Sequence, residues 1–125
     1  MNQERDPLTE KVIGLAIEVH RELGPGLNES IYEAALEFEL RQARLQCSRQ
    51  VAIDVKYKGR TLGMGFRVDL IVERTLPIEL KAVDCLSELH RAQLITYLRL
   101  LSLKRGLLLN FNAMPLHVGI RRVSL

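Results

Sequence analysis

Three charged residues, Asp69, Glu79 and Lys81, stand in segments that are otherwise apolar, and their spacing suits metal chemistry. Asp69 lies late in one predicted strand, and Glu79 and Lys81 are two apart in the next, so these two share a face. If the short connection of residues 73–77 makes the strands neighbours, all three groups converge near one end of the hairpin. Two carboxylates and a backbone carbonyl are the hard oxygen ligands that Mg²⁺ or Mn²⁺ prefers, and a lysine could orient water or offset phosphate charge. The alternative, which spacing alone leaves open, is a solvated strand face.

Polar residues of two predicted helices offer further parts of such a site. His90, Gln93 and Tyr97 recur at spacings of three and four and form one stripe beside an apolar face. This stripe either faces the strand ends, holding substrate or water, or is an exposed face whose tyrosine hydroxyl reaches solvent. Glu29 and Tyr32 share a face of an earlier helix, where the helix dipole alone is a sufficient reason for a carboxylate in the first turn.

The elements that must position these residues follow from hydrophobic periodicity. Apolar residues three or four apart predict helices, and alternation of apolar and polar residues predicts strands. The predicted helices span residues 8–23, 28–43 and 88–103, and the predicted strands span 51–57, 61–72, 78–83, 107–111 and 118–121. The order α-α-β-β-β-α-β-β indicates an α/β or α+β domain with one mixed sheet.

Local signals define the helix ends and the faces that we expect to be buried. Asp6 with Pro7 begins the first helix, Asn28 caps the second and Ser87 the third, and Gly24-Pro25-Gly26 ends the first. The predicted core stripes, in helix order, are Val12, Ile13, Ala16 and Val19; Ile31, Ala34, Ala35 and Phe38; and Ala92, Ile95, Leu98 and Leu101.

Length and charge bound the function without naming it. A chain of 125 residues is the size of one domain. With 18 Lys and Arg against 15 Asp and Glu the net charge is +3, which a polyanionic partner would suit but which does not demonstrate one. Small basic groups such as Lys56, Lys58 and Arg60 are read more simply as solvated surface. Aromatic residues are only 5% of the chain, so we do not expect base recognition by stacking.

The cysteines and the apolar runs bear on the compartment. Cys47 and Cys85 belong to no CxxC or CxxH pair, so we expect reduced, inert thiols. Residues 1–7 are polar where a signal peptide would need an apolar core. No apolar run approaches the roughly 20 residues that span a membrane. We therefore expect a cytoplasmic protein that has no membrane partner.

Taken in order, the motifs resemble the GxxExxY protein family, which is assigned to the PD-(D/E)xK nuclease superfamily. The matching segments cover nearly the whole chain: Gly26…Glu29…Tyr32, Arg67-Val68-Asp69-Leu70, Glu79-Leu80-Lys81-Ala82-Val83 and His90-Arg91-Ala92-Gln93 through Tyr97. Val68 replaces the nominal proline, at a position that varies widely in the superfamily. The resemblance implies a restriction-endonuclease-like core, a central mixed sheet flanked by helices, with residues 1–125 forming one nuclease-like domain.

The resemblance also implies roles at the strand ends. Asp69 and Glu79 would ligate Mg²⁺ or Mn²⁺, and the Leu80 carbonyl would join them. Lys81 would position the attacking water and stabilise the developing charge. Glu29 would be the helical acidic residue that completes the site or binds a second metal through water.

On the third helix, Gln93 and Tyr97 match the QxxxY element of RecB-like members, which would place this helix toward the DNA backbone. His20 and His90 stand where the family pattern commonly has histidines. The resemblance assigns them no defined role, and we expect structural hydrogen bonds from both.

The function implied is that of a metal-dependent deoxyribonuclease, which hydrolyses phosphodiester bonds of DNA with metal-activated water, either within a strand or from its end. Two alternatives stay open: a catalytically silent nucleic-acid-binding module, and a protein-interaction module that keeps the nuclease fold. A chain this short leaves little material for separate target recognition, so we expect a homodimer or a larger protein complex to supply it.

Overall fold

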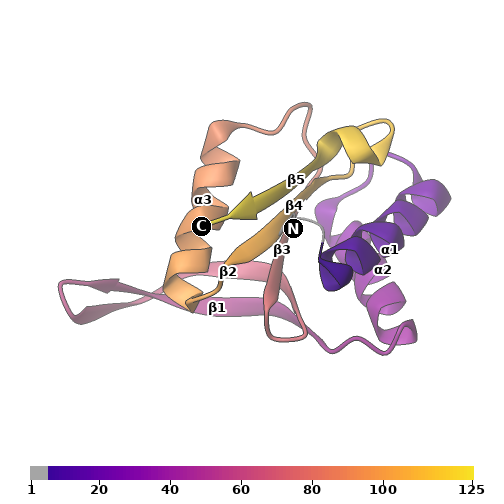
Figure 1. Ribbon diagram of the computed structural model, residues 1–125. Helices are drawn as coiled ribbons and strands as arrows, with labels where there is room; N and C mark the ends of the chain where they lie inside the picture. The colour runs from indigo at the N-terminus through magenta and orange to yellow at the C-terminus, as the bar shows by residue number, and fades with distance from the viewer. Residues whose placement is uncertain (1–5) are drawn as a thin grey trace.

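Three helices flank one five-stranded sheet in the computed structural model (Figure 1), which describes residues 6–125 except the side chain of Met64. Residues 1–5, on which the expectation about a signal peptide largely rests, lie outside the described residues. The elements in chain order are α1 (Pro7–Leu23), α2 (Glu29–Gln42), β1 (Cys47–Tyr57), β2 (Arg60–Val72), β3 (Leu76–Lys81), α3 (Glu88–Leu101), β4 (Arg105–Asn110), the 3₁₀ helix η2 (Leu116–Gly119) and β5 (Ile120–Ser124). Within residues 6–125, no helix has both the length and the apolar character that crossing a membrane requires.

The sheet is mixed, as the element order predicts. Its strands lie in the order β1-β2-β3-β4-β5, and β3 and β4 form the one parallel pair, with Ile78 opposite Leu107. All other neighbouring strands are antiparallel. Helix α3 makes the crossover between the two parallel strands, because parallel neighbours need a long connection.

Helices cover both faces of the sheet, with α1 and α2 on one side and α3 on the other (Figure 1). The cluster under α1 and α2 includes Ile78 and Leu80, whereas Leu108 packs with α3. The central strands β3 and β4 are therefore buried on both faces, which is why their sequences read as continuous apolar runs. Glu79 interrupts one of these runs, and it is buried with it.

The predicted buried face of α2 is correct only at Ala35, which packs partly buried against the core. Ile31 is 43% exposed and Phe38 is 58% exposed. The buried residues follow a different stripe, one residue along: Tyr32, Glu33, Leu36 and Leu40. Because Tyr32 and Glu33 are polar, the sequence pattern predicts this stripe to be exposed. Both side chains are buried because they have hydrogen-bond partners inside the fold.

The predicted stripe of α3 is correct only in part. Leu98 is buried, and Ile95 and Leu101 pack partly buried against the core. Ala92 is exposed, and Leu94 and Tyr97 take its place in the core. The burial of Tyr97 also shows that this residue does not lie on an exposed helix face.

The last predicted strand begins two residues later than expected, because residues 118 and 119 belong to the 3₁₀ helix η2, and it continues to Ser124. Gly119 ends this helix in close contact with the end of β4. A Cβ at Gly119 would lie 2.8 Å from the Asn110 carbonyl oxygen and 2.6 Å from the Ala113 Cβ. Only glycine allows this approach without a shift in the backbone.

Tyr32 holds the loop before α2. Its hydroxyl donates a hydrogen bond to the Gly24 carbonyl at 2.6 Å and accepts one from the Leu27 amide at 3.0 Å. Its ring stacks on Phe111 with centroids 4.5 Å apart and planes inclined by 12°. In the same loop Gly26 has a φ of 98°, in the left-handed region that favours glycine. The spacing of Gly26 and Tyr32 thus sets where α2 begins.

We expect Tyr32→Phe to lower the free energy of unfolding by roughly 1–3 kcal/mol, because a carbonyl and an amide would lose their shared partner in a partly buried site. Urea denaturation followed by circular dichroism measures this change. The matched control is Tyr57→Phe, since Tyr57 is 57% exposed and should change stability by less than about 0.5 kcal/mol. Equal losses for the two variants would contradict the anchoring role.

Candidate active site

Strands β2 and β3 separate at Asp69 and Glu79. Their backbone ladder ends at the pair Leu70 and Ile78. Beyond it, side chains replace the ladder: the Asp69 amide donates to Glu79 Oε1 at 3.0 Å, and the Leu80 amide donates to Asp69 Oδ2 at 2.8 Å. We call this opening the fork. Each carboxylate is held by the backbone of the opposite strand, so both are fixed before any ligand binds.

Of the two carboxylates of the fork, that of Glu79 is buried and that of Asp69 is half-buried, and they are close enough to repel each other. Glu79 is 5% exposed. Burial, and then the charge of Asp69, raise its pKa to about 7. Burial also raises the pKa of Asp69. Lys81 offsets this only in part, because its Nζ lies 3.9 Å from Glu79 Oε2. Two negative charges with one nearby ammonium group favour a bound cation.

The fork offers oxygen ligands alone, which suits a hard divalent cation. Within residues 6–125, no three side chains of His, Cys, Asp or Glu gather into a ready-made metal cluster. Mg²⁺ typically takes one or two carboxylates and completes its shell with waters and substrate phosphates. The pair formed by Asp69 and Glu79 fits that pattern, and it does not fit a structural zinc site.

Lys81 stands at the mouth of the fork, as the last residue of β3. Its backbone is fixed, because its carbonyl accepts the Phe111 amide at 2.8 Å and it pairs with Asn110 of β4. Its side chain is 19% exposed. The ammonium group is therefore near both the carboxylates and solvent, where a substrate would enter.

Glu29 approaches the same end of β3 from the first turn of α2. Its Oε2 accepts a hydrogen bond from the Ala82 amide at 3.2 Å, and its charge contributes to the raised pKa of Glu79. The helix dipole is thus not the only partner of this carboxylate.

Tyr97 of α3 is 3% exposed and lies over the fork. Burial, followed by the charges of Glu79 and Asp69, raises its pKa to about 12. The hydroxyl therefore keeps its proton at neutral pH and is available as a hydrogen-bond donor. Its ring contacts Phe66 of β2, with centroids 5.4 Å apart.

Gln93 and His90 precede Tyr97 in α3, nearer the start of the helix. Both line an open pocket that Phe66 of β2 also lines. Gln93 is half-buried there, and no contact joins it to the carboxylates in the part of the chain that the structure describes. His90 makes the expected structural hydrogen bond: its Nδ1 accepts the Ser87 amide at 3.1 Å, which caps the helix.

Two residues that are linked by hydrogen bonds to Asp69 were not predicted from the sequence, Glu33 and Gln50. Buried Glu33 accepts hydrogen bonds from Arg49 at 2.8 Å and from Gln50 Nε2 at 2.7 Å, and the same Nε2 donates to Asp69 Oδ1 at 3.2 Å. Gln50 has a φ of 50°, an uncommon backbone conformation within a strand. Glu33 follows Glu29 by four residues on the same helix face, and that spacing is the signal that could have revealed it.

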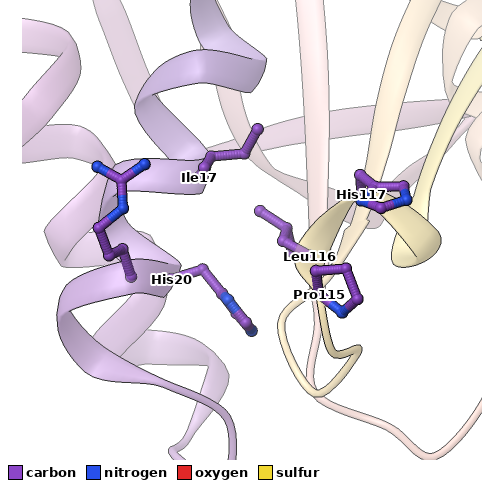
Figure 2. Close-up of a pocket in the computed structure, with 6 residues that line it drawn as sticks. Ile17, His20, Pro115, Leu116 and His117 are labelled. Carbon is purple, nitrogen blue, oxygen red and sulfur yellow. The ribbon is translucent and has the colours of Figure 1, made fainter.

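The expected hydrogen bond of His20 is not seen at its Nε2. This atom is buried and has no partner among residues 6–125. The ring lies 6.3 Å from Phe111 and lines a pocket between α1 and η2 (Figure 2). The residues lining this pocket, Ile17, His20, Arg21, Pro115, Leu116 and His117, include none of the predicted site residues.

Comparison with known proteins identifies the family. A family model described as the PD-(D/E)XK nuclease superfamily matches residues 6–123. No curated protein and no solved structure matches the chain. The mixed sheet with helices on both faces is the expected restriction-endonuclease-like fold. Because the family model covers nearly every residue, the chain belongs to the PD-(D/E)XK nuclease superfamily.

Proposed function

We propose that the protein is a metal-dependent nuclease of the GxxExxY branch, which hydrolyses phosphodiester bonds of DNA. Membership of the superfamily supports nuclease chemistry and a nucleic acid as the partner. The observation that carries the proposal is the pair of buried Glu79 and half-buried Asp69, whose charges Lys81 offsets only in part. With the Leu80 carbonyl, these carboxylates would hold Mg²⁺ or Mn²⁺.

When bound, the cation supplies Lewis-acid stabilisation of the charge that develops on the phosphate oxygens. Lys81 positions the attacking water with its ammonium group and stabilises the same developing charge. Tyr97 donates a hydrogen bond to the substrate from its protonated hydroxyl. Gln93 binds the substrate from the preceding turn of α3. Glu29 completes the acidic end of the site, beside the segment that follows Lys81.

The proposal extends to the setting in which the protein acts. Cys47 and Cys85 are both free thiols, which favours a reducing compartment such as the cytoplasm. Because the fold has few elements beyond those that build the site, a second copy of the chain or a larger complex would contribute target recognition.

We expect Asp69→Asn and Glu79→Gln each to abolish cleavage of labelled DNA in the presence of Mg²⁺, since both carboxylates are metal ligands. Lys81→Ala should lower the rate by about 10²- to 10⁴-fold, as the loss of a group that positions water and stabilises charge typically does. Gel analysis of the products under single-turnover conditions measures these rates. Glu22→Gln, an exposed change on α1, is the matched control and should cleave normally. Wild-type cleavage by either carboxylate variant would assign the chemistry elsewhere, and no cleavage by the wild type would leave the protein a silent binding module.

The metal-free protein should lose stability as the pH rises from about 5 to about 8. The pKa of Glu79 is about 7 in the fold, against an ordinary value of 4.5, so its proton stabilises the fold below that range and the contribution is lost as pH rises through about 7. Thermal unfolding in EDTA measures this, and the difference between wild type and Glu79→Gln isolates Glu79 from the histidines. Millimolar Mg²⁺ should restore the wild type at about pH 8 and leave Glu79→Gln unchanged. Identical pH profiles for the two proteins would contradict this.

A further inference from the structure

The positive charge of the chain is concentrated in one hairpin. Residues 52–67, the distal parts of β1 and β2 with their turn, form a segment that we call the arm, and it extends past α3 and away from the rest of the sheet (Figure 1). The arm has four basic residues and one acidic residue, Asp54. Its formal net charge is therefore +3, equal to that of the whole chain, and the remaining residues balance to zero.

The cations of the arm are exposed and are not neutralised by the fold. They are Lys56, Lys58, Arg60 and Arg67. Lys56 donates to Thr61 Oγ1 at 2.9 Å, and the Lys58 ammonium lies 5.4 Å from the Tyr57 ring centroid, but among residues 6–125 none of the four makes an ion pair. Some cations of the body do pair, as Arg49 does with Glu33.

The arm also exposes apolar side chains beside its cations. Tyr57 is 57% exposed, Leu62 is 64% exposed and Phe66 is 39% exposed. Basic residues that alternate with exposed aromatic rings are the surface on which single-stranded nucleic acids bind, because phosphates meet the cations while unpaired bases stack on the rings. Duplex DNA offers the phosphates but keeps its bases stacked inside.

A pocket adjoins the arm at Phe66, the residue that contacts Tyr97. It lies between the base of the arm and α3 and is lined by Phe66, Leu89, His90, Ala92, Gln93 and Thr96. Leu89 is 76% exposed at its edge. On the inner side, Phe66 contacts Tyr97, and the charges of Glu79 and Asp69 act on the Tyr97 hydroxyl. An apolar surface with one amide beside it suits a flat, polar-edged base.

We propose that a single strand of DNA binds along the arm and places one unpaired base in this pocket, against Phe66 and the Gln93 amide. The arm's cations contact the phosphates, and the strand leads from the pocket to the fork. The inference rests on the proposed nuclease function, and it names the substrate class as single-stranded DNA or an unpaired segment. The low aromatic content of the chain is a poor guide here, because two of its exposed aromatic rings lie on the arm.

Fluorescence anisotropy in EDTA tests the proposal with a labelled, unstructured oligonucleotide and its duplex. Wild type should bind the single strand at least about tenfold more tightly than the duplex. The variant Lys56→Gln, Lys58→Gln, Arg60→Gln should lose at least about tenfold in affinity for the strand. Its dependence of log K on log salt should become shallower by about two, since each phosphate contact on a single strand contributes about 0.7.

The matched control removes three exposed cations of the body: Lys11→Gln, Arg44→Gln and Lys104→Gln. It has the same net charge as the arm variant, so it should bind nearly as the wild type does if position matters rather than total charge. Equal affinities of the arm variant and the control overturn the proposal. So does equal binding of strand and duplex by wild type, or binding of neither.

Phe66→Ala tests the pocket and should weaken binding of the strand by about 5-fold to 100-fold, the usual effect of losing one stacked base. Phe66→Tyr keeps the ring and should restore binding, which a merely misfolded alanine variant would not explain. A Phe66→Ala variant that binds like wild type overturns the proposal that a base lies in the pocket.

Binding in EDTA does not depend on cleavage, so the two proposals fail separately. If no DNA is cleaved with Mg²⁺ but the arm variant loses affinity, the nuclease function fails and the strand path stands. If cleavage needs Asp69 and Glu79 but the arm variant binds and cleaves as the control does, the strand path fails alone.

Discussion

The candidate site depends on one interruption of β pairing. Strands β2 and β3 are joined by only three residue pairs before they separate at Asp69 and Glu79. Two main-chain amides would then face the gap, and a buried amide without a partner is costly. The carboxylates accept both hydrogen bonds, so the same side chains close the backbone and leave charge in the interior. The raised pKa of Glu79 is the consequence of that arrangement.

An open fork keeps its geometry only if its strands are held elsewhere, and β4 provides this support for β3. The two strands run parallel through the pair Lys81 and Asn110. Beyond the pair, the buried Asn110 side chain accepts the Val83 amide at 3.1 Å and donates to the Val83 carbonyl at 2.9 Å. The Asn110 side chain thus makes the two backbone hydrogen bonds that a neighbouring strand would make. It also fixes residues 82 and 83, where the Ala82 amide donates to Glu29.

Element types and the convergence of Asp69, Glu79 and Lys81 could be predicted from sequence, because they need only period-two spacing and a short connection. The network of Glu33 and Gln50 could not, since its hydrogen bonds join an α2 residue to the edge strand β1. The predicted buried face of α2 was mostly wrong for a related reason. The positions of apolar residues favour burial of Phe38, whereas the fold buries the polar side chains of Tyr32 and Glu33, which have hydrogen-bond partners. Ends of strands also shifted by up to four residues where backbone pairing extends past the apolar pattern.

The separation of charge between arm and body makes the molecule an electric dipole. A body whose formal charges cancel experiences little net pull in the field of a polyanion, whereas the arm is attracted. In the field of a polyanion the protein would therefore rotate so that the tip of the arm approaches first and the body follows. Such orientation speeds productive association and weakens with ionic strength over a Debye length of about 10 Å. The arm can in this way select the direction of approach before any specific contact forms.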